Sequence, residues 1–272
     1  MRMEDLDPDR SRSIYADAAL EDLRWLGIPW QEGPDIGGPF APYQQSRRRP
    51  VYLNLWRRLL ELGYIYPCRC SRRDLAGTAT APHEGLKADG RRPDFSDDEP
   101  IYPGTCRRFL QSIPETLRSA GLATDSPEGI NWRFRVPDRE EIGFEDVNLG
   151  PRSFIAGVDF GDFLVWRRDG VPSYQLACVA DDAAMAITEV VRGADLLKST
   201  SRQILLYRAL GWKPPAWFHC ELVLDEAGRR LSKRHDALSI RSLRQRGFAP
   251  EEVLTRTWRH KVEIGEWDSG SV

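Results

Sequence analysis

The stretch Arg230-Leu231-Ser232-Lys233-Arg234 directs the interpretation of the whole chain, because it places a small basic loop just after a predicted strand. Residues 217–224 have the composition of a strand, and Asp225-Glu226-Ala227-Gly228 predicts a turn before Lys233. A lysine supplies a compact, mobile charge, while a serine hydroxyl and backbone N–H groups supply uncharged donors to phosphate oxygens. The stretch therefore favours a polyphosphate site and nucleotide chemistry, with a solvated surface loop as the alternative.

Positive charge is concentrated around this loop. From Arg229 to Arg246 there are seven Lys or Arg residues and one acid, Asp236, whereas the chain of 272 residues has a formal net charge of −2. A local basic patch on a nearly neutral protein favours a polyanionic partner on one face. The alternative is a solvated helix face after the loop.

Composition bounds the class of protein. With 41% hydrophobic residues, the chain can bury a full core, as one large domain or two smaller ones. No run approaches the roughly 18 apolar residues of a membrane span, and the acidic N-terminus, residues 1–7, does not read as a signal peptide. We therefore expect a cytoplasmic monomer without membrane association. In that reducing compartment, clustered cysteines favour a metal site over a disulfide.

Helix and strand signals alternate along the chain without internal repeats, which predicts an α/β fold. Helices are expected from Ser11 or Ser13 to Gly27, over residues 50–62 and 199–210, and from Pro250 onward. The second helix should bury a stripe of Val51, Leu55, Leu59 and Leu62. Strands are expected over residues 132–136, 163–165, 175–180, 187–191 and 217–224.

Three cysteines suggest a metal site. Cys68 and Cys70 are one residue apart, and Cys106 follows 36 residues after Cys70, beyond a segment rich in Gly, Pro and Asp. A bound zinc ion could order such a segment, because zinc favours thiolate ligands in tetrahedral sites and contributes about 10 kcal/mol or more to folding. His83 is the conventional candidate for the fourth ligand and Tyr102 an unusual one. The alternative is three free, buried thiols.

Polar residues also stand where the predicted strands end. Tyr174 precedes the strand expected over residues 175–180, Asp181-Asp182 ends it, and Arg192-Gly193-Ala194-Asp195 ends the next apolar run. In α/β sheets, ligands bind at the carboxyl ends of the strands. An arginine beside a glycine can approach a ligand and offers a bidentate fork to a carboxylate. The alternative is a structural salt bridge between Arg192 and one of these acids.

Four stretches together carry a resemblance to a known family. They are Arg2-Met3-Glu4-Asp5-Leu6-Asp7-Pro8, residues 172–182, Glu189-Val190-Val191-Arg192-Gly193-Ala194-Asp195-Leu196, and Arg230-Leu231-Ser232-Lys233-Arg234. In this order they resemble the catalytic domain of class I glutamyl-tRNA synthetases. The Cys-x-Cys and Tyr-x-x-x-Cys pattern is most like that of the shortened relatives called glutamyl-Q tRNA(Asp) synthetases.

The resemblance implies roles for the basic loop and for the residues at the strand ends. Lys233 and Ser232 would be catalytic, and together with Leu231 and Arg234 they would hold ATP and steady the departing pyrophosphate. Mg²⁺ would accompany the ATP.

The same resemblance implies a glutamate pocket and a zinc site. Arg192 would pair with the side-chain carboxylate of glutamate, Tyr174 would line the pocket, and Glu4 would lie near the α-amino group. One structural zinc ion would be held by Cys68, Cys70, Tyr102 and Cys106.

The resemblance also implies an organisation. It predicts a Rossmann-type class I aminoacyl-tRNA synthetase domain: residues 1–66 as the first part of the nucleotide fold, 67–136 as a zinc-binding insertion, 137–240 as the second half with the signature loop, and 241–272 as a helical tail. The family's first βα unit, with its His-x-Gly-His type sequence, has no counterpart before Arg2, so a truncated sheet with an unpaired edge is expected. We expect that Met1 was assigned at an internal position; a degenerate paralogue is the alternative.

The function implied by the resemblance is activation of glutamate with ATP as glutamyl-adenylate, followed by transfer to the queuosine base of tRNA(Asp). Two alternatives belong to other classes of protein. One is a catalytically inactive paralogue that binds tRNA, and the other is a fragment of an ordinary glutamyl-tRNA synthetase.

Overall fold

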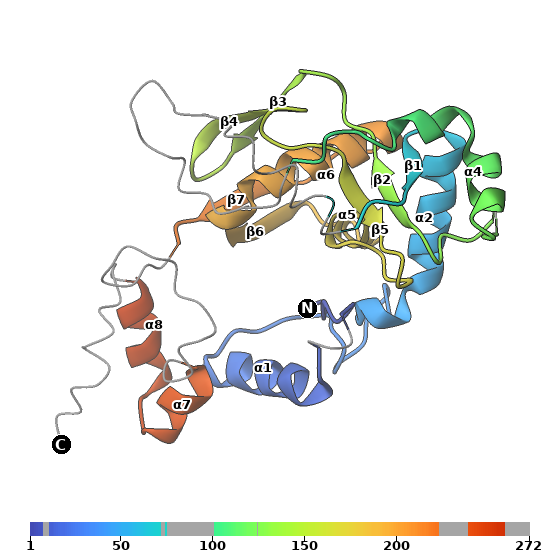
Figure 1. Ribbon diagram of the computed structural model, residues 1–272. Coiled ribbons are helices and arrows are strands. Elements are labelled where there is room, and N and C mark those ends of the chain that lie inside the picture. The colour runs from blue at the N-terminus through green and yellow to red at the C-terminus, as the bar shows by residue number, and fades with distance from the viewer. Residues whose placement is uncertain (8–10, 72–73, 75–100, 124, 223–238, 259–272) are drawn as a thin grey trace. The chain divides into compact units, whose positions relative to one another are not determined.

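The computed structural model describes residues 1–7, 11–71, 74, 101–123, 125–222 and 239–258 (Figure 1). The chain divides into two compact units. The larger is Arg47–Cys220, and the smaller combines residues 1–46 with residues 221–272. Among the described residues, no helix has the length and apolar character needed to cross a bilayer.

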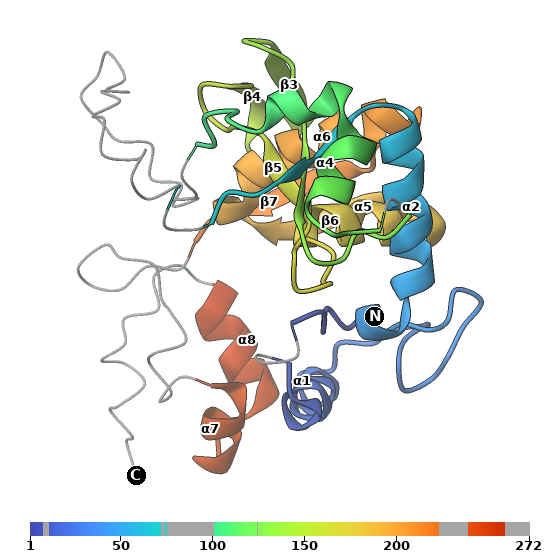
Figure 2. The same cartoon turned by 45° about the vertical axis from the view of Figure 1, so that its right-hand side comes forward.

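The larger unit contains two sheets. Strands β1 (Ile65–Cys68), β2 (Asn131–Phe134) and β5 (Phe163–Trp166) form an antiparallel sheet in the order β1-β2-β5. Strands β3 (Glu141–Asp146), β4 (Gly150–Ile155), β6 (Glu189–Gly193) and β7 (Ala216–Cys220) form a mixed sheet in the order β4-β3-β7-β6. Figure 2 shows the β3–β4 hairpin at one end of this unit.

The mixed sheet has the connectivity of a nucleotide fold on one side. From β6 the chain passes through a short 3₁₀ turn, η3 (Ala194–Leu196), and helix α6 (Leu197–Leu210) into β7, which lies parallel to β6. Helix α6 packs against β3 and β4 (Figure 1). This βαβ crossover aligns the carboxyl ends of β6 and β7, where α/β proteins place their ligand sites.

The core of the larger unit is aromatic. Helix α2 (Arg49–Glu61) contributes Trp56, whose ring meets Trp132 of β2 edge-on at 4.9 Å. Helix α2 begins where Pro50 occupies its first turn, as the sequence predicts. The predicted stripe is confirmed at Leu55 and Leu59, which are buried, and is wrong at Val51 and Leu62, which are exposed, while Tyr52 and Trp56 are fully buried. The buried face of α2 therefore combines two aliphatic and two aromatic side chains.

Helix α5 (Tyr174–Ala184) replaces the strand predicted over residues 175–180, so that prediction is wrong. Every residue from Leu176 to Asp182 is buried, so the segment has no amphipathic period that distinguishes a helix from a strand. The missed signal is Ser173, whose hydroxyl accepts from the Leu176 N–H and caps the helix. Asp181 lies inside the helix and binds Arg48 at 2.6 Å.

Other elements agree with the sequence to within a few residues. Helix α6 begins at Leu197, two residues before the predicted Ser199 cap, and ends before Gly211, which adopts the left-handed backbone that favours glycine. The β3–β4 hairpin was not predicted. Between β1 and β2, the structure describes a 3₁₀ helix, η2 (Arg107–Gln111), and helix α4 (Ile113–Ser119).

The smaller unit is built around α1 (Ser13–Trp25), η1 (Gln45–Arg47, shared at its end with the larger unit), α7 (Ile240–Gln245) and α8 (Pro250–Trp258). Leu243 and Val253 form a buried cluster with Trp25, Leu26 and Phe248. Arg244 adds ion pairs with Glu21 at 3.0 Å and Asp22 at 3.3 Å. The helical tail predicted from Pro250 therefore packs within a compact unit that also contains the N-terminal helix.

Candidate functional site

The structure brings together Arg192 and Tyr174, which the sequence placed on separate segments. Arg192 lies one residue before the end of β6, and Tyr174 is the first residue of α5. Nη1 of Arg192 donates to the phenol oxygen of Tyr174 at 3.4 Å. Because Tyr174 is 37% exposed, this pair lies at the surface of the larger unit.

Two further contacts fix the Arg192 guanidinium. Nη2 donates to the Thr200 hydroxyl at 2.6 Å, and Nε donates to Nε2 of His219 at 3.2 Å. Of the five N–H donors of a guanidinium, these contacts and the one to Tyr174 use three. Within the described part of the chain, no carboxylate pairs with Arg192, so the alternative of a structural salt bridge with Asp181, Asp182 or Asp195 is not supported.

Strand register brings His219 to Arg192. In the parallel pair β6–β7, Arg192 and His219 are direct partners, and in the pair β3–β7 Asp146 lies opposite Trp217. Nδ1 of His219 and Oδ2 of Asp146 are 2.5 Å apart, and both side chains are fully buried. The mixed sheet therefore aligns an acid, an imidazole and a guanidinium across three strands.

The hydrogen bonds define the proton on the imidazole. Nε2 of His219 accepts from Arg192, so the ring proton lies on Nδ1 and is donated to Asp146. Burial lowers the pKa of His219 and outweighs the hydrogen bond to Asp146, which raises it. Burial raises the pKa of Asp146, but the hydrogen bonds from His219 and from the Leu149 N–H outweigh it and leave the pKa lowered. Both directions favour a neutral imidazole beside an ionised carboxylate.

The turn after β3 holds Asp146 in place. Oδ1 accepts from the backbone N–H groups of Leu149 at 2.9 Å and Asn148 at 3.2 Å. The Asn148 amide donates to the His219 carbonyl at 2.9 Å, which ties this turn to β7. Asp146 is thus anchored by backbone donors on one oxygen and presents the other to His219.

This arrangement can bind an anion with two oxygens. Counting contacts to the described residues, Arg192 retains one N–H on each terminal nitrogen beyond those to Tyr174 and Thr200, and a carboxylate can accept from both. The half-exposed Tyr174 gives the site a polar wall. The geometry is that of a carboxylate receptor with a pre-positioned arginine.

Glu4 lies in the smaller unit. Its Oε1 accepts from Arg2 at 3.0 Å, and the neighbouring Met3 forms a parallel bridge with Gln44. The Met3 N–H donates to the Tyr43 carbonyl at 2.8 Å, so the backbone beside Glu4 is held in place. The role of Glu4 stays a prediction. The four predicted ATP-binding residues, Leu231, Ser232, Lys233 and Arg234, lie outside the described residues, as does His83.

The three cysteines of the predicted metal site converge. The sulfurs of Cys68, Cys70 and Cys106 all lie within 4.8 Å of one another. The Tyr102 hydroxyl lies 3.4 Å from the Cys68 sulfur and 3.6 Å from the Cys70 sulfur, and 3.6 Å separates the sulfurs of Cys70 and Cys106. These four side chains come from two segments separated by more than 30 residues.

The spacing fits a tetrahedral metal ion. A zinc–sulfur distance of about 2.3 Å implies sulfurs about 3.8 Å apart at the corners of a tetrahedron, close to the separations in this cluster. A hydrogen bond from Cys68 lowers the pKa of the Cys106 thiol to about 4, although burial raises it. The same interaction, with Cys68 as donor, raises the pKa of Cys68. The cluster therefore favours a thiolate, which is the form that binds metal.

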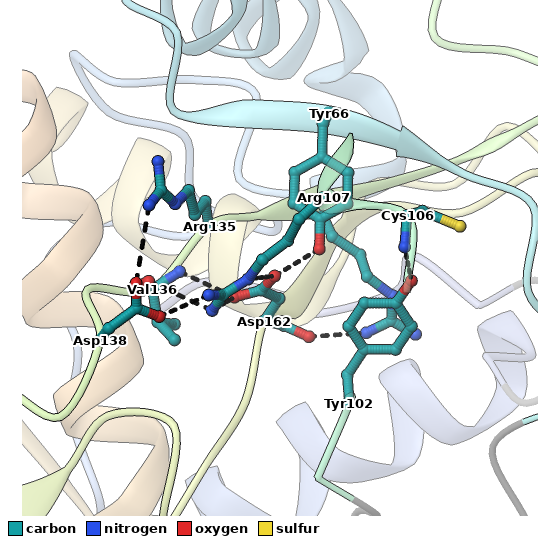
Figure 3. A network of polar contacts seen from close by, with 9 residues as sticks. Tyr66, Tyr102, Cys106, Arg107, Arg135, Val136, Asp138 and Asp162 are labelled. Carbon is teal, nitrogen blue, oxygen red and sulfur yellow. Dashed lines mark hydrogen bonds and ion pairs between the residues drawn. The ribbon is translucent and has the colours of Figure 1, made fainter. Parts of the chain in front are cut away.

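A buried carboxylate, Asp162, lies beside the segment that carries Cys106 (Figure 3). Asp162 accepts two hydrogen bonds from Arg107, each at 2.6 Å, one from the Val136 N–H at 2.9 Å, and one from the Tyr66 hydroxyl. Arg107 directly follows Cys106 in the chain, so Asp162 anchors the segment that carries this thiol. The network ties the cysteine cluster to the antiparallel sheet.

Arg133 forms the other side of the cluster. Its guanidinium stacks 4.0 Å from the centre of the Tyr102 ring and donates to the Cys68 sulfur at 3.4 Å. Nη1 of Arg133 donates to the Asp162 carbonyl at 2.7 Å. The hydrogen bond to Cys106 and burial raise the pKa of the Cys68 thiol, and they outweigh the charge of Arg133, which lowers that pKa.

Sequence analysis missed several residues of both sites. His219, Asp146 and Thr200 were not assigned a role, since 73 residues separate Asp146 from His219 and only strand register joins them. One signal was present: His219 is a polar residue inside an apolar strand. For Arg133 and Asp162, the sequence offers no comparable signal.

Comparisons with known proteins agree with the fold. The family described as "tRNA synthetases class I (E and Q), catalytic domain" matches residues 1–266. A glutamyl-Q tRNA(Asp) synthetase of Symbiobacterium thermophilum is 49% identical over 254 residues, 93% of this chain and 73% of that protein. A protein of the same name from Nitratidesulfovibrio vulgaris is 46% identical over 93% of this chain and 72% of its own length.

A solved structure shows the same architecture. The crystal structure of a glutamate tRNA ligase from Elizabethkingia meningosepticum, in complex with its amino acid, matches with a TM-score of 0.69 and 26% identity. The match covers 95% of this chain and 53% of the ligase, so the chain spans about half the length of that protein. On these findings, the chain is an aminoacyl-tRNA synthetase-like ligase that belongs to the class I tRNA synthetase catalytic-domain family for glutamate and glutamine.

Proposed function

We propose that this ligase activates glutamate with ATP and transfers it to the queuosine base of tRNA(Asp). The first part of the proposal depends on the Arg192 guanidinium, which is held by neutral acceptors and, counting contacts to the residues that the structure describes, has two N–H donors left for a carboxylate. A receptor for the side-chain carboxylate distinguishes glutamate from glutamine, because an amide offers one acceptor and one donor where the fork requires two acceptors.

The first step would join the α-carboxylate of glutamate to ATP. A carboxylate oxygen attacks the α-phosphorus, the bond between the α-phosphorus and the bridging oxygen breaks, and pyrophosphate leaves with that oxygen. Because two anions must approach each other, the site acts by positioning and by fixed positive charge rather than by a general base. Arg192 would hold the side chain, so that the α-carboxylate is the one presented for attack.

The basic loop would supply the charge at the other end of the reaction. Lys233 and Ser232, with Leu231 and Arg234, carry the pattern that the sequence assigns to ATP binding. A mobile lysine can follow the departing pyrophosphate, with Mg²⁺ neutralising its charge. Glu4 would face the α-amino group of the substrate, to which a carboxylate is complementary.

The metal would have a structural role. Cys68, Cys70, Tyr102 and Cys106 would hold one zinc ion, which when bound would crosslink β1 to the segment that leads into η2. None of these four side chains is among the contacts of Arg192, which are Tyr174, Thr200 and His219.

The tRNA substrate is proposed from the names of the two relatives, both glutamyl-Q tRNA(Asp) synthetases at 49% and 46% identity. The test is transfer of radiolabelled glutamate by the protein expressed from its complete reading frame, with zinc bound. We expect labelling of tRNA(Asp) that contains queuosine and none of the same tRNA transcribed without queuosine. Equal labelling of both tRNAs, or of the 3′ end of a glutamate tRNA alone, would contradict the proposal.

The two alternatives give other results in the same experiment. A fragment of an ordinary glutamyl-tRNA synthetase would charge the 3′ end of glutamate tRNA and leave queuosine untouched. An inactive paralogue would bind tRNA with a strong dependence on salt, through the basic patch from Arg229 to Arg246, and would form no adenylate.

A further inference from the structure

In the part of the chain that the structure describes, Arg192 is held in place by neutral hydrogen-bond acceptors rather than by an opposite charge. His219 accepts from Nε at 3.2 Å, Thr200 accepts from Nη2 at 2.6 Å, and Tyr174 accepts from Nη1 at 3.4 Å. A carboxylate in place of any of these would neutralise the guanidinium and compete with an anionic ligand. The orientation of the Arg192 guanidinium therefore depends on these three neutral groups. Each of them can accept a hydrogen bond from Arg192 only if its own proton points away from the guanidinium.

His219 meets this condition through Asp146. An imidazole presents a lone pair on Nε2 only when its single proton lies on Nδ1. Oδ2 of Asp146 lies 2.5 Å from Nδ1 and binds that proton. Oδ1 is occupied by backbone donors of the following turn, so the carboxylate cannot turn away without losing them.

We infer that Asp146 and His219 form a positioning pair, which fixes the imidazole as an acceptor and thereby aims the Arg192 guanidinium at the carboxylate of the substrate. This inference rests on the proposed function, because it assigns Arg192 to the side chain of glutamate. Neither residue touches the substrate. Asp146 sets the tautomer of His219, and His219 with Thr200 sets the plane and direction of the fork.

A purely structural role for the pair gives different expectations. If Asp146 and His219 only hold β3 to β7, changing the tautomer should alter stability and leave glutamate recognition as it was. If the pair positions Arg192, the change should act on the affinity for glutamate and not on that for ATP. The variant must therefore change the tautomer while keeping the packing.

The substitution Asp146→Asn changes the tautomer of His219 and keeps the packing. The amide oxygen can keep the backbone donors of Leu149 and Asn148, while the amide nitrogen replaces Oδ2 and donates to Nδ1. The imidazole proton then moves to Nε2 and faces the Nε–H of Arg192, so two donors meet and the hydrogen bond is lost. Asp169→Asn is the matched control, because Asp169 lies in the same unit on an exposed turn.

Nuclear magnetic resonance of the imidazole nitrogens reads the tautomer directly. The chain has four histidines, and His219→Gln identifies the signals of His219. We expect the proton on Nδ1 in the wild type and in Asp169→Asn, and on Nε2 in Asp146→Asn. The Arg192 Nε–H should be protected from exchange in the wild type and lose that protection in Asp146→Asn. An unchanged tautomer, or unchanged protection, would overturn the inference.

Glutamate-dependent exchange of pyrophosphate into ATP gives the functional readout. In Asp146→Asn we expect KM for glutamate to rise about tenfold or more, the size expected from losing a charge-assisted hydrogen bond, with KM for ATP unchanged and kcat altered less. A changed tautomer with an unchanged KM for glutamate would also overturn the inference. Absence of exchange in the wild type would instead count against the proposed function, and the two resonance measurements would still decide the geometry of the pair.

Discussion

Arg192 shows how a sheet can hold a cation ready for a ligand without neutralising it. Its three protein contacts are to a phenol, a hydroxyl and an imidazole, and the imidazole is fixed by an acid one strand further on. A single charged pair with Arg192 would have been stronger, but it would have left less of the guanidinium for a substrate. The affinity for glutamate should therefore depend on the shape of the fork as well as on its charge.

Arg192→Lys separates these two properties. The variant keeps the positive charge and loses the bidentate fork, so kcat/KM for glutamate should fall by about 10- to 100-fold, or about 1.5–3 kcal/mol. Steady-state pyrophosphate exchange measures this loss. Arg208→Lys is the matched control, since Arg208 pairs with Glu140 on the surface with both side chains 49% exposed, and its activity should equal that of the wild type. Equal activities of the two variants would show that the fork is not used.

Acid should weaken glutamate recognition through His219. The pKa of this imidazole lies below its ordinary value of 6.5, so Nε2 remains an acceptor at neutral pH and becomes a donor only at more acid pH. Asp146 favours the protonated form, Arg192 disfavours it, and Asp195 lies close enough to favour it. KM for glutamate should stay constant above pH 6.5 and rise as the pH falls further, whereas in His219→Gln this rise should be absent. The same rise in both proteins would assign the effect to another group.

The lowered pKa of His219 also makes the free energy of unfolding depend on pH. Because the folded pKa of His219 is depressed, the unfolded chain takes up the proton first as the pH falls below 6.5. The contribution of the neutral imidazole is therefore complete above pH 6.5 and declines as the pH falls through the folded pKa. Asp146 adds a second loss below its ordinary value of 3.8, since its pKa is also lowered. Urea denaturation of the wild type between neutral and acid pH measures the combined loss.

The first residues of helix α5 affect both the stability of the fold and the position of Tyr174 beside Arg192. Ser173 caps the helix and Tyr174 follows it directly, so the cap also places the phenol beside Arg192. Ser173→Ala should lower the free energy of unfolding by about 1 kcal/mol and raise KM for glutamate. Ser153→Ala, on the exposed face of β4, should change neither. A stability loss without any change in KM would mean that Tyr174 is positioned by its packing alone.

The cysteine cluster makes a separate prediction about β1 and the segment before η2. Cys68→Ser should reduce the zinc content from about one ion per chain and lower the thermal midpoint, because it removes one of the four proposed ligands. Metal analysis and a thermal melt measure these changes. Cys220→Ser is the control, since Cys220 is exposed and outside the cluster. Equal zinc contents in the two variants would exclude Cys68 as a ligand.

The sequence predicted helices best where a proline or a glycine stands at the helix boundary. Pro50, Gly211 and Pro250 each mark a helix boundary, and all three helices are present. Helix α5 was mistaken for a strand, because burial on all sides removes the pattern on which the distinction depends. The convergence of Arg192 with Tyr174 was expected from the family resemblance, whereas His219 and Asp146 required the strand register. Patterns local to the chain can be read from sequence; contacts across a sheet cannot.

The whole molecule places the candidate site near an edge of its mixed sheet. In the described part of the chain β6 pairs with β7 alone, and Val191 is 61% exposed. The family resemblance predicts a sheet with an unpaired edge, and it does not say which strand that edge is.

The central claim is that the chain activates glutamate through Arg192, and exchange of labelled pyrophosphate into ATP tests it most directly. The protein should be expressed from its complete reading frame and loaded with zinc. We predict exchange that depends on glutamate, is not supported by glutamine, and is strongly reduced in Arg192→Lys. No glutamate-dependent exchange by the wild-type protein would contradict the claim, as would exchange at the wild-type rate in Arg192→Lys.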